Sequence, residues 1–178
     1  MPTRSPIAVA LSLVLLSGCG GWRIGSGLYV RHSSPPKRAR KEATFAFGDP
    51  GTGWTPVRNL KDVQVAWIHR ELGGLIELHA QCDDQGDSSL DQFTDHLRID
   101  WDHWEVESQE QERLVGRAAL HTVALAELDG IERRNEFWVV KKNGCLFDLR
   151  YSANPTHFDD GRAAFDDVVA GFRFPVRG

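Results

Sequence analysis

Histidine, cysteine and aspartate, the residue types that most often bind zinc or transfer protons, are scattered along this chain. One local group brings several of them together, at His79, Cys82, Asp83 and Asp84. Imidazole, thiolate and carboxylate are all zinc ligands. The stretch before Asp83 alternates like a strand, however, which places His79 and Cys82 on opposite faces. We therefore predict no metal site here, and favour a surface histidine beside a disulfide-bonded cysteine.

The sequence Trp-Asp-His-Trp at 101–104 is the second arrangement that could do chemistry, because two indoles flank a carboxylate and an imidazole. Aromatic residues at a helix end usually pack, and an Asp adjacent to a His in sequence cannot by itself orient it as a catalytic dyad does. A ligand pocket between sheet and helix is the functional alternative. Its candidate ligand or docking residues are Trp67, Trp101, His103 and Trp104.

The oxygen-rich sequence "CDDQGDSSLD" is a weak calcium candidate, because calcium takes several oxygens from one loop. Its glycine falls in the wrong place for an EF-hand loop and no glutamate closes it, so a capped helix start is favoured. The chain has no Gly-x-Ser-x-Gly elbow, no Walker loop and no His-Glu-x-x-His motif. We therefore predict no catalytic residue and no cofactor.

The N-terminal segment ends in the third cysteine, Cys19. Arg4 precedes an apolar run over 7–16, which is too short to span a bilayer and has the form of a secretory signal. The sequence Leu16-Ser17-Gly18-Cys19 resembles the lipobox of bacterial lipoproteins. This resemblance implies that the Cys19 sulfur takes a diacylglycerol, that residues 1–18 are removed, and that several acyl chains anchor the protein. An ordinary secretory signal with a chance cysteine is the alternative.

Residue 20 is Gly. In Gram-negative lipoproteins an Asp at this position tends to retain the protein at the inner membrane. The resemblance therefore implies the outer membrane, facing the periplasm. The inner membrane and the cell surface remain alternatives.

Cys82 and Cys145 are the thiols left once Cys19 is lipidated. The compartment beyond the inner membrane is oxidising, so we predict that they form a disulfide. Such a disulfide closes a loop of roughly 60 residues. In the chain-entropy model, a closed loop of this length stabilises the folded state by about 4 kcal/mol. Two separate buried thiols are the alternative, because sequence alone does not show that the two Cα atoms approach.

Charge divides the remaining chain into a basic tether at 19–42 and an acidic domain at 43–178. The tether has six Lys and Arg against one Glu, a net of +5, and the domain has 14 against 24 acids, a net of −10. The tether either lies on anionic headgroups, at about 1 kcal/mol per cation, or is a solvated linker. The acidic domain argues against nucleic-acid binding, which needs a positive face.

The most acidic part of the domain is 83–112, with eleven Asp and Glu against one cation, Arg98. This acidic surface could dock a protein partner. A solvated face is the alternative interpretation.

Hydrophobic periodicity predicts the elements. Alternation predicts a strand near 44–47 and a hairpin formed by 63–72 and 75–82 around Gly73-Gly74. A helix follows, capped by Ser88 or Ser89, with an apolar stripe of Leu90, Phe93 and Leu97.

A long meander follows over 105–115, 117–128, 131–142 and 145–151. Asp129-Gly130 and Asn143-Gly144 are its hairpin turns, and the second turn pairs Val140 with Phe147 and Trp138 with Leu149. A final helix carries Phe165, Val168, Val169 and Phe172 and stops at Gly171.

The predicted fold class is therefore α+β: an antiparallel sheet of one hairpin and a meander, packed by an early inserted helix and a C-terminal helix. This element order, with phrases such as "KKNGC", resembles the PsbP-like fold over about 43–176, and a set of uncharacterised bacterial lipoproteins that share it. PsbP-like proteins are mostly accessory subunits and binding modules, and no functional residue of theirs can be carried onto this chain.

The leading functional hypothesis is a membrane-anchored, non-enzymatic periplasmic lipoprotein that docks on a protein partner. A small-molecule or metal-binding module is the second hypothesis. A hydrolase whose residues are scattered through the sequence is the third, because such sites escape motif searches.

Overall fold

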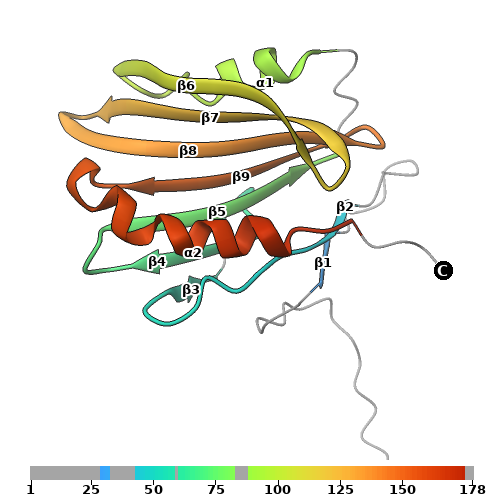
Figure 1. Cartoon of the computed structure of the whole chain (residues 1–178), viewed down its shortest axis with the longest axis horizontal. Coiled ribbons are helices and arrows are strands. Elements are labelled where there is room, and N and C mark those ends of the chain that lie inside the picture. The colour runs from blue at the N-terminus through green and yellow to red at the C-terminus, as the bar shows by residue number, and fades with distance from the viewer. Residues whose placement is uncertain (1–28, 33–42, 59, 83–87, 175–178) are drawn as a thin grey trace, which may run out of the picture.

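A seven-stranded antiparallel sheet dominates the computed structural model of the protein (Figure 1). The structure describes residues 29–32, 43–58, 60–82 and 88–174. The strand order is β3-β4-β5-β9-β8-β7-β6, with β1 and β2 as a separate pair. This confirms the predicted α+β class. The elements are β1 (Tyr29–His32), β2 (Ala43–Ala46), β3 (Thr55–Val57), β4 (Val65–His69), β5 (Gly74–Gln81), α1 (Leu90–His96), β6 (His103–Leu114), β7 (Arg117–Leu128), β8 (Ile131–Lys142), β9 (Cys145–Ala153), a 3₁₀ turn (Pro155–His157) and α2 (Phe158–Gly171).

Three two-residue turns connect the strands of the meander from β6 to β9. Their paired residues are Val115-Gly116, Asp129-Gly130 and Asn143-Gly144, all with φ between 51° and 76°. Two consecutive positive φ angles define the turn whose twist matches that of paired strands. The last turn sets the predicted register, with Val140 opposite Phe147 and Trp138 opposite Leu149.

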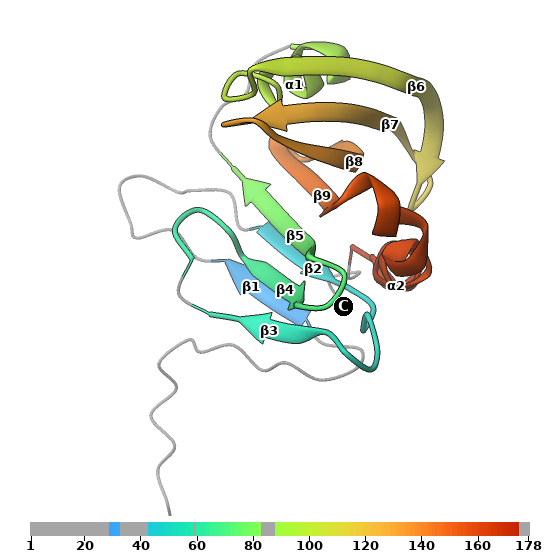
Figure 2. The same cartoon turned by 90° about the vertical axis from the view of Figure 1, so that its left-hand side faces the viewer.

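The main core lies between the sheet and α2, which crosses one face of it (Figures 1 and 2). Phe165 and Val168 of α2 are buried in the same cluster as Ile76 and Leu149 of the sheet. Gly161 lets the helix approach closely, because a Cβ there would collide with the Tyr151 hydroxyl. That hydroxyl donates a 2.8 Å hydrogen bond to the Phe158 carbonyl, which fixes the start of α2 on the sheet.

The opposite face of the sheet carries α1, which is only seven residues long. Phe93 packs there on Val139 and Leu146, and Leu90 and Leu97 extend the contact, as the predicted stripe requires. Ser89 and Gln92 form a reciprocal capping box at 3.1 and 3.2 Å. We call the two sides of the sheet the α2 face and the α1 face.

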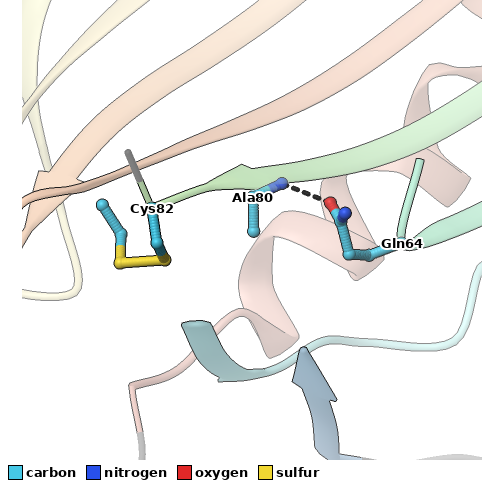
Figure 3. The surroundings of a disulfide bond; sticks show 4 residues. Gln64, Ala80 and Cys82 are labelled. Atoms are coloured by element: carbon cyan, nitrogen blue, oxygen red, sulfur yellow. Dashed lines mark hydrogen bonds between the residues drawn. A yellow bond between two sulfur atoms is a disulfide. The ribbon is translucent and has the colours of Figure 1, made fainter. Parts of the chain in front are cut away.

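Strands β4 and β5 are held together beyond their regular ladder by Gln64, which is buried (Figure 3). Its backbone N–H donates to the Leu78 carbonyl at 3.0 Å, and its side-chain oxygen accepts from the Ala80 N–H. Gln64 precedes β4, and its side-chain oxygen serves as the acceptor for the buried N–H of Ala80 on β5.

The predicted disulfide between Cys82 and Cys145 is present (Figure 3). The β5–β9 register pairs Gln81 with Leu146, so the two cysteines lie opposite each other in the next position, with their Cα atoms 4.0 Å apart. The bond closes a loop with a sequence separation of 63. The alternative of two separate thiols is wrong.

Two strands were not predicted. Residues 29–32, inside the predicted tether, form β1 and pair with β2, because Tyr and Val favour an extended strand and the edge of β2 is available. The short β3 pairs with β4 through Thr55 and Ile68. Cys19, the lipobox and the rest of the tether lie outside the described residues, as do Asp83 and Asp84.

Replacing both Cys82 and Cys145 by Ser should lower the free energy of unfolding by about 4 kcal/mol, since the unfolded chain loses its closed loop. For a domain of this size, Tm should fall by about 10 °C. Calorimetry with and without a thiol reductant checks this. Reduction should lower the Tm of the wild-type chain equally and leave the double variant unchanged. A reductant-insensitive wild-type chain would contradict the prediction.

Candidate functional site: a cavity on the α1 face

Beyond the end of α1 the α1 face of the sheet is uncovered, and a cavity of about 420 Å³ opens there. It lies over β5, β9 and β8, near the β7–β8 turn. Its apolar and aromatic lining consists of Leu75, Leu97, Trp101, Leu128, Ile131, Phe137 and Tyr151. Its polar lining consists of Glu77, Asp129, Arg133, Asn135, Arg150 and Ser152.

Asp102 fixes the position of one wall of the cavity, because it fastens the loop after α1 to the β7–β8 turn. Its backbone N–H donates to the Glu127 carbonyl at 2.8 Å, and its carboxylate accepts from the Asp129 N–H at 2.8 Å. Trp101 is thereby held over the cavity. Behind it, Trp104 stacks on Phe137 with a centroid distance of 5.6 Å. The loop therefore forms a fixed aromatic wall.

Glu77 and Arg150 face each other across the β5–β9 pair and form part of the polar floor. Arg150 Nη2 lies 2.6 Å from Asp148 Oδ2, while its Nε is buried without a hydrogen-bond partner. Burial by itself would raise the pKa of Glu77, but the nearby His79 and the charge of Arg150 outweigh it and lower that pKa below its ordinary value. Glu77 is therefore a carboxylate at neutral pH.

Arg133 is the second guanidinium of the cavity and is half-buried. Its Nε donates to Ser152 Oγ at 3.1 Å, and its Nη2 donates to the carbonyls of Gly73 and Ser152 at 2.7 and 2.9 Å. These acceptors are neutral, and within the described ranges no carboxylate forms an ion pair with Arg133. Burial lowers its pKa. The floor thus holds a desolvated cation without a counterion.

A second polar cluster lies on the α2 face, around Glu136, which is only 1% exposed. His121 Nε2 lies 2.7 Å from one Glu136 oxygen, and Arg162 Nε of α2 lies 3.0 Å from the other. His121 Nδ1 also contacts Glu112 at 3.0 Å, and its ring stacks on Trp138 at 4.3 Å. Each oxygen of the carboxylate lies within ion-pair distance of a cationic or imidazole nitrogen, so this cluster ties α2 to the sheet, although Glu136 Oε2 and Arg162 Nε form no hydrogen bond within the described residues.

The four aromatic and histidine candidates do not form one pocket. Trp67 is 3% exposed and packs on Phe47 in the α2-face core, with ring centroids 5.4 Å apart. Its expected place beside Trp101 and Trp104 is wrong, because strand alternation sends it to the other face. His103 points to solvent, 4.0 Å from Glu105. Trp101 lines the cavity and Trp104 supports its wall.

His79 and Cys82 lie on opposite faces, as alternation requires, with His79 beside Glu77 at 3.7 Å. Over the described part of the chain, no three His, Cys, Asp or Glu side chains converge to hold a metal. The described acidic residues between 88 and 112 are exposed. Their docking role stays a prediction.

Sequence reasoning did not find Arg133, Arg150 or Glu77. A signal was available, because "IELHA" and "FDLRYS" alternate apolar with polar side chains. Such alternation indicates that one face of each strand is buried and the other polar. The convergence of these side chains on one cavity depends on the β5–β9–β8 pairing, which only the structure supplies.

No protein-family model matches the chain, and neither does any curated protein. Solved structures do match in fold. LpqN of Mycobacterium tuberculosis, described as involved in cell envelope biogenesis, has a TM-score of 0.55 at 11% identity, covering 82% of this chain and 90% of its own. Cyanobacterial PsbP (CyanoP) from Synechocystis sp. PCC 6803 has a TM-score of 0.51 at 17% identity, covering 88% of this chain and 97% of its own.

A protein of Bacteroides thetaiotaomicron VPI-5482 also matches, with a TM-score of 0.51 at 9% identity over 75% of this chain. This chain spans 45% of the length of that protein. At these identities the likeness establishes the PsbP-like fold and nothing finer.

The His121 cluster should make stability depend on pH. Burial would lower the pKa of His121, but hydrogen bonds and charges of Glu136 and Glu112 outweigh it and raise the pKa above 6.5. The stabilisation is therefore fully present below the unfolded-state pKa and is lost as pH rises through the folded-state pKa.

The free energy of unfolding of the wild-type chain and of His121→Phe, measured by urea titration at about pH 5.5 and about pH 8.5, checks this. The destabilisation caused by the substitution should be larger at the lower pH. His103→Phe, at an exposed histidine, is the matched control and should cause no such difference. An equal loss at both pH values for His121→Phe would contradict the assignment.

Proposed function

We propose that this chain is a non-catalytic binding module of the bacterial cell envelope, held at the membrane by a lipidated Cys19, and that it binds through the cavity on the α1 face. One observation carries the proposal: in a cavity with an apolar wall, Arg133 forms no ion pair with any described carboxylate, and the lining also includes Arg150, whose buried Nε has no hydrogen-bond partner among the described residues. Concave, mostly apolar sites with a few convergent polar groups are the general form of ligand sites.

The side chains around the cavity favour binding over catalysis. Among the described residues no histidine lines it. Two of its lining residues carry hydroxyls: Ser152 Oγ accepts from Arg133 Nε, and the Tyr151 hydroxyl donates to the Phe158 carbonyl. Elsewhere in the described chain, the histidine hydrogen bonds go to carboxylates or main chain and not to Ser, Thr or Cys. An activated nucleophile needs such a base.

The location in the envelope rests on two features of the chain. The lipobox at Leu16–Cys19 implies a lipid anchor. The Cys82–Cys145 disulfide is of a kind that persists in oxidising compartments. The resemblance to LpqN, which is itself involved in cell envelope biogenesis, is consistent with this location. Among the described residues, no helix has the length and apolar character to cross a membrane.

A second candidate function is protein docking through β6, which lies at the edge of the sheet and pairs only with β7 in the described structure. Its exposed side chains include Glu105 and Glu110. Edge strands accept an added strand from a partner, and a basic partner strand would complement these charges. A register shift between Val106 and Ser108 interrupts the ladder, which limits such pairing.

Cys19→Ser should release the chain from the membrane fraction of cells, because no acyl chain can then attach. Fractionation followed by detection of a C-terminal tag measures this. The double variant Cys82→Ser and Cys145→Ser is the control, because it removes both other cysteines without leaving an unpaired thiol and keeps the anchor. A Cys19→Ser chain that stays membrane-bound would contradict the lipid anchor.

Photo-crosslinking in cells should distinguish the two candidate surfaces. Ile131 at the cavity and Val106 on β6 are both exposed apolar residues, at 63% and 48%, and suit a photoreactive substitution. A product at position 131 that disappears with Arg133→Gln is expected. Products only at position 106 would favour edge docking instead.

A further inference from the structure

We infer that the cavity binds a small amphiphile with one anionic head group, a carboxylate or a phosphate, placed on Arg133 and Arg150, with its apolar body against the wall of Trp101, Leu97 and Ile131. This inference rests on the proposed function, because it names the class of ligand for the same cavity.

The head group follows from the charges of the floor. Arg150 is balanced by Asp148 at 2.6 Å and faces Glu77 across the strand pair. The hydrogen bonds of Arg133 go to neutral oxygens, and among the described residues no carboxylate forms an ion pair with it, so both carboxylates of the floor, Glu77 and Asp148, lie beside Arg150 instead. A desolvated cation is stabilised by an anion that enters with it. One anionic group would therefore give Arg133 the ion-pair partner that the described residues do not supply.

The two guanidinium groups also have hydrogen-bonding capacity that the protein does not use. The hydrogen bonds of Arg133 use Nε and Nη2 and leave Nη1, and the buried Nε of Arg150 has no partner. Arg133 reaches the side chain of Ser152, the next residue after Arg150 on this face of β9, and both arginines line the cavity. Planar guanidinium groups suit carboxylate and phosphate oxygens.

The apolar body follows from the mouth of the cavity. Leu128 and Ile131 flank the β7–β8 turn and are 41% and 63% exposed, although both line the cavity. Exposed apolar side chains around a cavity favour an occupant that covers them. A volume of about 420 Å³ lies within the roughly 300–1,000 Å³ of small-molecule sites. A single aliphatic chain or ring system therefore fits better than a folded protein segment.

The carboxylates at the mouth strengthen the need for an apolar body. Asp129 lines the cavity and Asp102 adjoins it, both exposed. They repel a small hydrophilic anion, so the head group alone gains little by entering. Burial of apolar surface, at about 25 cal/mol per Å², supplies the additional free energy. Both parts of the ligand are required.

The test is calorimetric titration of the full chain carrying Cys19→Ser with decanoate, decanol and acetate, each below its aggregation concentration. Decanoate should bind about tenfold more tightly than decanol, a difference of ~1.4 kcal/mol, and acetate should not bind measurably. Decyl phosphate in place of decanoate tests a phosphate head. Phosphatidic acid vesicles, assayed by co-sedimentation, test whether the anion is presented by a membrane lipid rather than in free form.

Two variants locate the ligand. Arg133→Gln should abolish the preference for decanoate over decanol, while Arg98→Gln, at an exposed arginine that contacts Asp95, should preserve it. Ile131→Ser should weaken both amphiphiles, while Val106→Ser should weaken neither. Because Ile131 is at the surface, its substitution tests the site even if Arg133→Gln does not fold.

Equal binding of decanoate and decanol, or an unchanged preference in Arg133→Gln, would overturn the anionic head group while leaving the cavity as a binding site. No binding of any amphiphile, together with a protein crosslinked at position 131, would overturn the ligand class but not the proposed function. No binding and no crosslink there would overturn both.

Discussion

The alternation of side chains along β5, β9 and β8 is the constraint on which both faces of the sheet depend. Ile76, Leu78 and Leu149 point toward α2 and are buried, so the residues between them must point the other way. Those intervening residues include Glu77 and Arg150. Because the period is two, the apolar core and the polar floor are consequences of one register and cannot shift independently.

The two helices cover the two faces unequally. α2 has 14 residues and lies along the core, held close by Gly161 and the Tyr151 hydrogen bond. α1 has seven residues and covers only the part of its face around Val139 and Leu146. The uncovered remainder becomes the cavity. The two polar clusters then differ in kind: Glu136 is paired on both oxygens, whereas Arg133 is desolvated without a carboxylate partner. The first contributes to stability, and the second has capacity for a ligand.

Sequence patterns predicted the elements whose signals are local. Asn143-Gly144 fixed the register of β8 and β9, Ser89 marked the start of α1, and periodicity identified both helices. The cavity could not be predicted in the same way, because it depends on which strands become neighbours. Trp67 illustrates the limit: its burial follows from alternation, but its separation from Trp101 follows from the face on which α2 packs. The strand β3 was not predicted because its three residues are too few to show the alternation of apolar and polar side chains that indicates a strand.

The pairing of β5 with β9 has a consequence for how the chain folds. These neighbours at the centre of the sheet are separated in sequence by α1 and the whole β6–β8 meander, and the covalent link at their ends spans 63 residues. The meander consists of local hairpins, which form quickly, whereas the β5–β9 contact requires closure of a long loop before any burial compensates its entropy. An unfolded chain that keeps the link has already closed this loop. An oxidised chain therefore has less loop entropy to lose on folding than a reduced one, and the disulfide favours folding through the unfolded chain as well as through the folded structure.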